Sequence, residues 1–506
     1  MRFEHSPTRP VRTWVTLAAA GVIAATSLYG CALGPDYARP DAPEHAERTF
    51  AESHDASFAS TTTAANWWEL YNDPVLTRLI LQAFAHNPTI EVAKANLRLS
   101  RAQLDEAGAG RLPSIGTSAG YSRNRVGAEN FNTSASQAAG GSGFAADHGD
   151  FNYYRAGFDA SYEVDVFGRV SRSIEAARGD TQAAEAALDG ARISIAAQVA
   201  QSYVDACGFA DQADVARETA QIEANTEELT LRQLKSGRGT RRDVDQVTVL
   251  VEQANAQVPV LEGERRAQLY ALAALTGVSP SDIDSEAAQC RDVPKVTQPI
   301  PVGDGAALLA RRPDVRRAER KLAADTARIG VATAEFYPSV TLAGAASIGA
   351  PSFGNLGRGS SFSYSFGPLI SWTFPNIEAT RARIAESRAG ADASLMEFRA
   401  TMLAALEETE QALARYSAAL DQNAALVRAA AAADDAANLS RVRFDAGRDS
   451  FLDLLVAEQD RATARRALAT SDTSVADLQV SVFKALGGGW ESEAGDDKTS
   501  TVTSSR

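Results

Sequence analysis

Histidine and cysteine side chains are the groups that could carry metal or nucleophilic chemistry in this chain of 506 residues. The five histidines are His5, His45, His54, His86 and His148. None belongs to the His-Glu-x-x-His pair that would hold zinc on one helix face. The sequence has no P-loop and no Gly-x-Ser-x-Gly elbow, and the glycines at 140–143 lack the strand–helix context of a nucleotide site. We therefore predict that the chain is not an enzyme and binds no metal or cofactor.

One cysteine, Cys31, stands where a thiol is commonly acylated. A basic N-terminal region precedes an apolar stretch at 14–28 that is too short for a comfortable membrane span. The stretch ends in Leu28-Tyr29-Gly30-Cys31, which resembles the lipobox of bacterial lipoproteins. We expect residues 1–30 to be a signal peptide and Cys31 to become the new N-terminus, carrying lipid such as palmitate. An ordinary signal peptide followed by a chance cysteine is the alternative. By resemblance to enterobacterial lipoproteins, the alanine that follows Cys31 favours sorting to the outer membrane.

The composition limits the remaining classes of protein. The formal net charge of −14 argues against a general nucleic-acid binder, which would present a basic face. Hydrophobic residues make up 45% of the chain, so it can bury a large core. No later segment has the pattern of a transmembrane helix, so a chain that spans a bilayer would have to do so as a closed β-barrel.

The strongest structural pattern is an internal duplication. Asn87-Pro88 and Arg312-Pro313 are 225 residues apart, and Pro113 and Pro338 have the same spacing. Later pairs keep an offset of 210: Gly237 with Gly447, Asp243 with Asp453, and Gly277 with Gly487. Between these groups, 166–167 matches 373–374 at an offset of 207. The offset shrinks because the first half carries a longer polar loop, at about 124–150, than the second half, at about 351–360.

Both halves predict the same order of elements. A helix (74–108 and 305–335) ends at a Pro-Ser step. Two alternating strands follow, 115–121 with 153–167 in the first half and 340–348 with 362–374 in the second. A very long helix comes next (174–235 and 377–446), and a return helix ends each half (241–275 and 450–486). Pro259 is expected to kink or interrupt the first return helix.

These elements cannot complete a fold within one chain. A helix of about 60 residues spans on the order of 90 Å and needs lateral partners along its length. Four strands are too few to close a barrel, which needs about eight. Closure therefore requires several copies of the chain, or the strands remain as hairpins on a soluble body.

Four segments carry a resemblance to a known family: 31–40, 67–74, 162–168 and 309–319. By their order and by the duplication, residues 31–488 resemble the TolC-like outer-membrane efflux proteins, in particular the lipoprotein (NodT-type) branch that works with resistance-nodulation-division pumps. The resemblance implies a mainly α protomer with a β-barrel part. Three copies would form a barrel of twelve strands in the outer membrane, joined to a periplasmic α-helical barrel.

The resemblance also implies a function and a division of the chain. The protein would be a passive exit duct for small molecules, lipid-anchored in the outer membrane, and gated at its periplasmic tip. It would work as a homotrimer with a periplasmic adaptor (membrane fusion protein) and an inner-membrane resistance-nodulation-division transporter. The expected parts are a signal peptide (1–30), a lipidated N-terminal segment (31–73), a first repeat (74–290), an equatorial linker (291–304), a second repeat (305–488) and a disordered tail (489–506).

The family places its gate where the long and return helices meet. Asp243 and Asp453 each lie six residues after the glycine of that turn, so threefold symmetry would bring each into a ring of carboxylates. Such rings attract cations. Leu452 could add an apolar ring. The alternative is structural, because an aspartate in the first turn of a helix is stabilised by the helix dipole.

The remaining candidate residues follow from the family fold. Arg238, Arg241 and Arg242, near the same turn, could meet the adaptor, although a solvated surface is the alternative. The fold implies that Cys207 and Cys290 lie at similar height, which predicts a disulfide; two free buried thiols are the alternative. Trp67-Trp68 is expected to pack the N-terminal segment onto the helices.

Two other functions share parts of this pattern. A type I secretion duct for proteins would have the same fold, but the lipobox and the Gly-Pro-Asp-Tyr start favour small-molecule efflux. A lipid-tethered periplasmic coiled-coil protein would have the long helices without the alternating strands as a membrane barrel.

Overall fold

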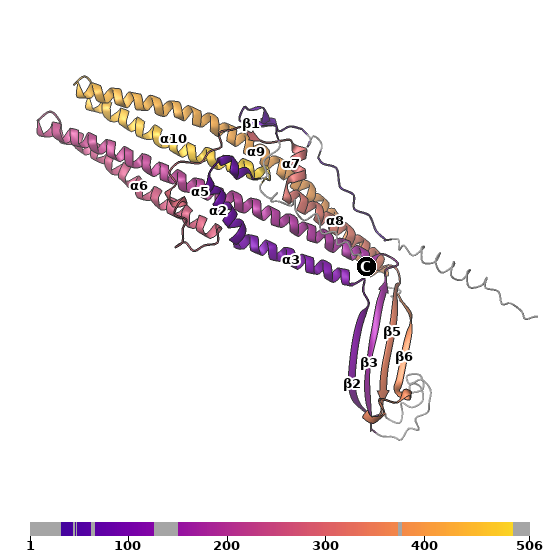
Figure 1. Ribbon diagram of the computed structural model, residues 1–506. Coiled ribbons are helices and arrows are strands. Elements are labelled where there is room, and N and C mark those ends of the chain that lie inside the picture. The colour runs from indigo at the N-terminus through magenta and orange to yellow at the C-terminus, as the bar shows by residue number, and fades with distance from the viewer. Residues whose placement is uncertain are drawn as a thin grey trace, which may run out of the picture. The chain divides into compact units, whose positions relative to one another are not determined.

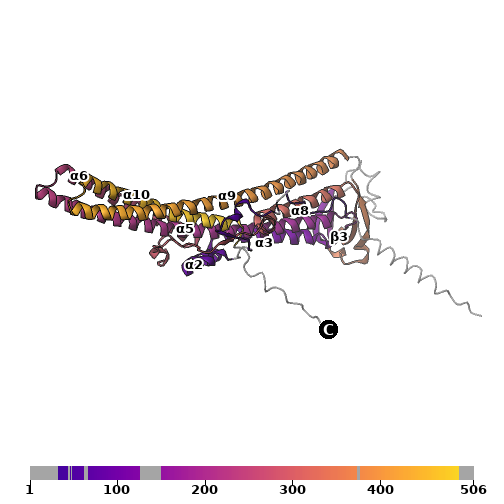
Figure 2. The same cartoon turned by 90° about the horizontal axis from the view of Figure 1, so that it is seen from above.

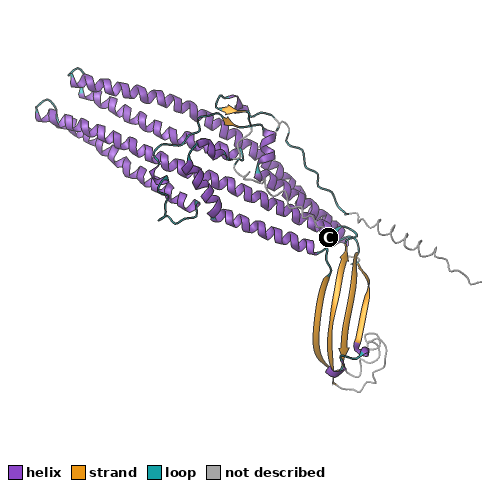
Figure 3. Cartoon of the chain, viewed as in Figure 1, coloured by secondary structure: helices purple, strands orange, loops and turns teal. Residues whose placement is uncertain are grey.

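The computed structural model describes residues 32–43, 46, 48–61, 66–125, 150–372 and 377–488. It divides into two compact units, and each unit takes elements from both sequence repeats. One unit comprises residues 1–38, 100–180 and 322–394, and the other comprises residues 39–99, 181–321 and 395–506. Helices predominate, and the strands form one four-stranded sheet and one short pair (Figure 3). This confirms the prediction of a mainly helical chain with four long strands.

The four-stranded sheet belongs to the first unit. Its order is β2-β3-β5-β6, and all neighbours are antiparallel (Figure 1). The strands are β2 (Ser114–Arg125), β3 (Asp150–Val164), β5 (Ser339–Ala350) and β6 (Phe362–Ser371). Strand β3 ends before the predicted residue 167, because the carboxylate of Asp165 turns to accept hydrogen bonds from the first amides of the next helix, Val170 at 2.9 Å and Ser171 at 2.7 Å. Residues 373–374, which the duplication aligns with 166–167, lie outside the described residues.

The two faces of this sheet differ in chemistry. Alternate residues point to opposite sides of a strand, and residues in register point to the same side. One face is apolar along most of its length, except for Arg123, Arg125, Asp150 and Asn152 at one end of the β2–β3 pair. Its apolar residues are Ile115, Ala119, Tyr121, Tyr154, Phe158, Tyr162, Val340, Leu342, Ile348, Phe362, Tyr364, Phe366 and Ile370. The other face is mostly small and polar, with Phe151, Tyr153 and Leu369 as exceptions, and hydroxyl pairs cross it at Ser114–Ser161 (2.7 Å), Ser339–Ser371 (2.7 Å) and Ser347–Ser363 (2.9 Å).

The helices form the larger part of the fold. They are α2 (Pro74–His86), α3 (Pro88–Ala109), α5 (Arg169–Lys235), α6 (Arg241–Leu275), α7 (Gly305–Arg311), α8 (Pro313–Ala334), α9 (Ile377–Asp445) and α10 (Phe451–Ala485). Helix α5 pairs with α6, and α9 with α10, as two long hairpins whose turns lie at the same end (Figure 2). Helix α6 is continuous past Pro259, so the predicted interruption does not occur. Among the described residues, no helix is both long and apolar enough to cross a membrane.

The first predicted helix of each repeat is in fact two helices. Asn87 separates α2, which ends at His86, from α3, which begins at Pro88, and Arg312 separates α7 from α8 in the same way. A residue that precedes proline is restricted to extended backbone, and both adopt it (φ −66°, ψ 126° and φ −61°, ψ 124°). Each then binds the end of its return helix: Asn87 Nδ2 donates to the carbonyl of Leu275 and Arg312 Nη1 to that of Ala485, both at 2.8 Å.

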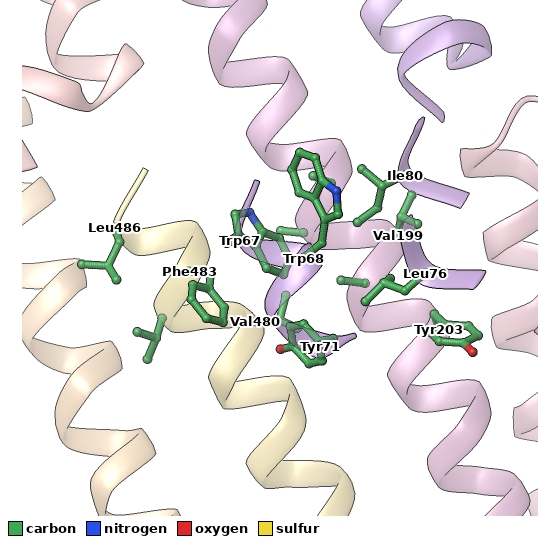
Figure 4. Close-up of a cluster of buried hydrophobic side chains, with 14 of the residues drawn as sticks. Trp67, Trp68, Tyr71, Leu76, Ile80, Val199, Tyr203, Val480, Phe483 and Leu486 are labelled. Carbon is green, nitrogen blue, oxygen red and sulfur yellow. The ribbon is translucent and has the colours of Figure 1, made fainter. Parts of the chain in front are cut away.

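The main core lies in the second unit, around a short 3₁₀ helix, η2 (Trp67–Tyr71). Trp67 is fully buried and stacks on Phe483 of α10 at a ring distance of 5.1 Å, and Trp68 contacts Trp67 edge to face at 5.9 Å (Figure 4). The packing role predicted for the tryptophan pair is therefore confirmed. Cys207 of α5 belongs to the same core and is disulfide-bonded to Cys290, with Cα atoms 5.1 Å apart.

The remaining elements are short. A parallel pair, β1 (Phe58–Ala59) with β4 (Ile300–Pro301), joins the N-terminal segment to the chain between the repeats. The 3₁₀ helices η1 (Ala51–His54), η4 (Ala287–Gln289), η5 (Phe353–Asn355) and η6 (Gly359–Ser361) occur in connections.

Candidate gate at the helical hairpin turns

The turns of the two long hairpins, residues 236–240 and 446–450, have the same backbone structure; we call them the hairpin tips. Gly237 and Gly447 have φ values of +74° and +70°, which favour glycine. At the first tip, the amide of Gly237 donates to Leu234 O at 3.0 Å and the next amide to Gln233 O at 2.9 Å. The second tip makes the same two hydrogen bonds at the corresponding residues. This is the Schellman motif, so the glycines of the sequence repeat are helix terminators.

Both candidate gate aspartates complete a capping box at the start of a return helix. The amide of Thr240 donates to Asp243 Oδ2 at 2.8 Å, and the amide of Asp243 donates to Thr240 Oγ1 at 3.3 Å. At the second tip, the amide of Ser450 donates to Asp453 Oδ2 at 3.0 Å, and the amide of Asp453 donates to Ser450 Oγ at 3.2 Å. The structural role considered for these residues is therefore present, and it holds each carboxylate at a fixed place beside the tip.

The environment of Asp453 favours its charged form. Its side chain is exposed, and hydrogen bonds from the hydroxyl and then the amide of Ser450 lower the pKa of the carboxyl group below its ordinary value. Asp243 is partly exposed on the other hairpin. The two tips therefore present a carboxylate each, one of which is held ionised by its cap.

The other predicted tip residues are solvent-accessible. Leu452 is an exposed apolar residue in the first turn of α10. Arg238, Arg241 and Arg242 are exposed on the first hairpin, and Arg241 Nε pairs with Asp245 Oδ1 at 2.9 Å. The structure thus brings these arginines together on one tip, at the surface.

A cluster of charged side chains between the hairpins was not predicted from the sequence. It contains Glu223 of α5, Arg441 of α9, and Glu458 and Arg461 of α10; we call it the seam cluster. Glu458 is buried, its Oε1 atom lies 2.6 Å from Arg441 Nη2, and its Oε2 atom contacts Arg461 Nη2. The sequence signal is weak: Glu458 follows Leu454 by four residues, so both lie on the same, inward-facing side of α10. Such positions are usually apolar.

The N-terminal segment that follows the predicted lipidation site is held on the first unit. The amide of Leu33 donates to Phe167 O at 3.3 Å, and Arg172 Nε donates to Leu33 O at 3.1 Å. Arg172 Nη2 also pairs with Asp36 Oδ1 at 2.6 Å. Gly168 has a φ of +77°, and a side chain there would collide with the backbone of Ala32. Cys31 itself lies outside the described residues.

Comparisons with known proteins agree with this architecture. The family model described as "Outer membrane efflux protein" matches residues 79–278 and 306–488. "Nodulation protein T" of Rhizobium leguminosarum bv. viciae is 28% identical over 465 residues, covering 92% of both chains. "Probable efflux pump outer membrane protein TtgC" of Pseudomonas putida is 30% identical, covering 94% of this chain and 96% of that protein.

Solved structures are similar over nearly the whole chain. The outer-membrane channel OprN is 30% identical with a TM-score of 0.82, covering 91% of this chain and all of that one. The open-state MtrE outer membrane channel of Neisseria gonorrhoeae is 26% identical with a TM-score of 0.78, covering 91% and 99% of the two chains. Since the family model matches both repeats, the chain belongs to the outer membrane efflux protein family.

Proposed function

We propose that this chain forms the outer-membrane channel of a tripartite efflux pump, a passive exit duct for small molecules. The observation that carries this proposal is the combination, in one chain, of a sheet with one apolar and one polar face and two long helical hairpins. Alternation of apolar and polar residues is typical of strands that separate lipid from an aqueous lumen. The relatives named as efflux outer membrane proteins and channels support the same function.

We further propose a homotrimer, lipid-anchored through Cys31. Among the described residues, β2 and β6 are the two unpaired edges of the sheet, and an exposed edge strand favours pairing with another chain. Three copies would supply twelve strands and remove every edge, whereas one copy has too few strands to close. The docking of residues 32–36 beside Gly168 would keep the lipid next to the start of α5.

The gate is assigned to the hairpin tips. In a trimer, Asp243 and Asp453 would each form a ring of carboxylates that attracts cations, and Leu452 would narrow the passage. Arg238, Arg241 and Arg242 are available to a periplasmic adaptor. Opening would be favoured by adaptor contacts that are stronger in the open state, since the chain has no motif that couples energy. An inner-membrane resistance-nodulation-division transporter would supply that energy.

The test is the conductance of the full-length purified protein in planar bilayers. Asp243→Asn/Asp453→Asn removes both charges and keeps an oxygen that can accept the capping hydrogen bonds. We expect small cation-selective channels from the wild type, and larger, less selective channels from this variant. Thr240→Ala/Ser450→Ala is the matched control, because it removes the capping hydroxyls and keeps the charges, and it should stay cation-selective.

The outcomes separate the parts of this proposal. If the asparagine variant conducts like the wild type, the gate lies elsewhere in the channel. If the capping control loses selectivity as fully as the asparagine variant, local helix structure and not charge is responsible. If a correctly folded trimer forms no channels, the channel function itself is wrong.

A further inference from the structure

Helix α5 of the first repeat packs against α10 of the second along a line of polar contacts, the α5–α10 seam. Gln212 Nε2 donates to Thr473 Oγ1 at 3.2 Å, and Glu218 Oε1 lies 2.7 Å from Arg465 Nη1. Nearer the tips, Glu223 lies by Glu458 in the seam cluster. Residue numbers rise along α5 as they fall along α10, so the two helices run antiparallel. The two repeats are therefore joined by polar side chains along this line.

The seam cluster lies at the tip-proximal part of this seam. Glu223 is twelve residues before the end of α5, about 18 Å from the first tip at helical rise. Arg441 Nη2, which pairs with Glu458, also donates to Thr226 Oγ1 of α5 at 3.2 Å. One cluster thus links α5, α9 and α10, the helices that would have to move relative to one another if the tips separated.

Glu223 is the member whose charge is poorly accommodated. It is 2% exposed, and its buried Oε2 atom has no hydrogen-bond partner among the described residues. Burial, and then the negative charge of Glu458, raise the pKa of Glu223 to about 7, against the opposing effect of Arg461 and Arg441. On the side that faces α6, the hydroxyl of Thr248 donates a hydrogen bond of 2.5 Å to Oε1 of Glu227, which follows Glu223 by four residues on α5. Glu223 therefore keeps its proton more easily inside the closed seam than in water.

The duplication shows that this cluster occurs at one of the two corresponding places in the repeats. At the offset of 210, Glu458 corresponds to Thr248 and Arg461 to Val251 in α6, and Glu223 corresponds to Ala433 in α9. The equivalent positions of the other repeat thus carry no charges. A device built from these residues would act between α5 and the α9–α10 hairpin alone.

We propose that the seam cluster is a proton-sensitive latch between the two repeats: protonated Glu223 stays buried against α10, and its ionisation favours separation of α5 from the α9–α10 hairpin. This inference rests on the proposed channel function, because separation of the hairpins would open the tips. A carboxyl group with a pKa raised by the closed state stabilises that state at low pH and loses the effect as pH rises through about 7.

The expected size follows from the two pKa values. For a glutamate with a pKa of about 7 when buried and an ordinary value of 4.5 when solvated, the ratio of open to closed seam rises about 30-fold per protomer between about pH 5.5 and about pH 8.5. Glu223→Gln places a neutral side chain of the same shape in the seam and should abolish this rise. Glu218→Gln is the matched control, because Glu218 is an exposed acid on the same seam.

Two readouts on the full-length trimer test the latch. Hydrogen exchange, corrected for the intrinsic effect of pH, should show protection falling with rising pH in peptides around 218–227 and 454–462 of the wild type and of Glu218→Gln, but not of Glu223→Gln. Channel open probability should rise with pH in the same two proteins only. Equal pH dependence of exchange in wild type and Glu223→Gln would overturn the latch, and so would loss of that dependence in Glu218→Gln. Because exchange needs no conductance, a trimer that forms no channels would contradict the channel function while the exchange data still decide the latch.

Discussion

Reduction of the disulfide between Cys207 and Cys290 should destabilise the second unit. The bond spans 83 residues, for which the chain-entropy relation gives about 4.5 kcal/mol near 25 °C. Residual structure in the denatured chain reduces such values, so we expect a loss of about 2–4 kcal/mol in the free energy of unfolding. The fold should persist after reduction, because Arg291 still pairs with Asp214 at 2.8 Å and Val296 still exchanges two hydrogen bonds of 2.9 Å with the side chain of Gln479.

Urea unfolding in detergent, with and without dithiothreitol, measures this effect. Tryptophan fluorescence is a suitable signal, since Trp67 and Trp68 lie in the same core as Cys207. A Cys207→Ala/Cys290→Ala variant is the control, and dithiothreitol should not lower its midpoint further. The reasoning would be refuted if thiol titration showed both cysteines reduced while the wild-type midpoint stayed unchanged.

Three further predictions concern stability. Burial and then Asp205 raise the pKa of Asp477 to about 8 from 3.8, so its contribution to stability is fully present below about pH 4 and is lost as pH rises through about 8. Asp477→Asn should therefore flatten the fall in urea midpoint between about pH 5 and about pH 8, and parallel curves for the two proteins would contradict this. Gly277→Ala should lower the midpoint more than Gly237→Ala, since both have positive φ but only at Gly277 would the new Cβ meet a backbone carbonyl of α2, at 2.6 Å; equal losses would exclude the contact as the cause. Trp67→Ala should cost about 3–5 kcal/mol because it empties a fully buried site, and calorimetry showing a loss below about 1 kcal/mol would remove it from the core.

Much of the fold could be predicted because its signals are local. The glycines that mark the duplication are helix terminators with positive φ, and the aspartates six residues later complete capping boxes. The alternation of the strands matches the two faces of the sheet. The main error, one helix in place of α2 with α3 and of α7 with α8, arose where a helical pattern continues through a residue that proline forces into extended backbone.

The residues of the candidate site also differ in whether the sequence could reveal them. Asp243, Asp453 and the tip arginines were predicted because the family resemblance places the gate at this turn, and their distance from its glycine identifies them in the chain. Glu223 was not found, because a glutamate on a long helix is usually solvated and nothing within a few residues of it indicates burial. Only the packing of α10 against α5 brings Glu458 to Glu223 and excludes water from both.

The sequence by itself determined the order of elements, the duplication, the helix caps and the alternation of the strands, since these depend on hydrogen bonds and steric limits that act over a few residues. The tertiary structure alone decided which helices of the two repeats are neighbours, which charges lie between them and where the linker meets α5. Those outcomes depend on burial, and burial is a property of the neighbours that a residue acquires from distant parts of the chain.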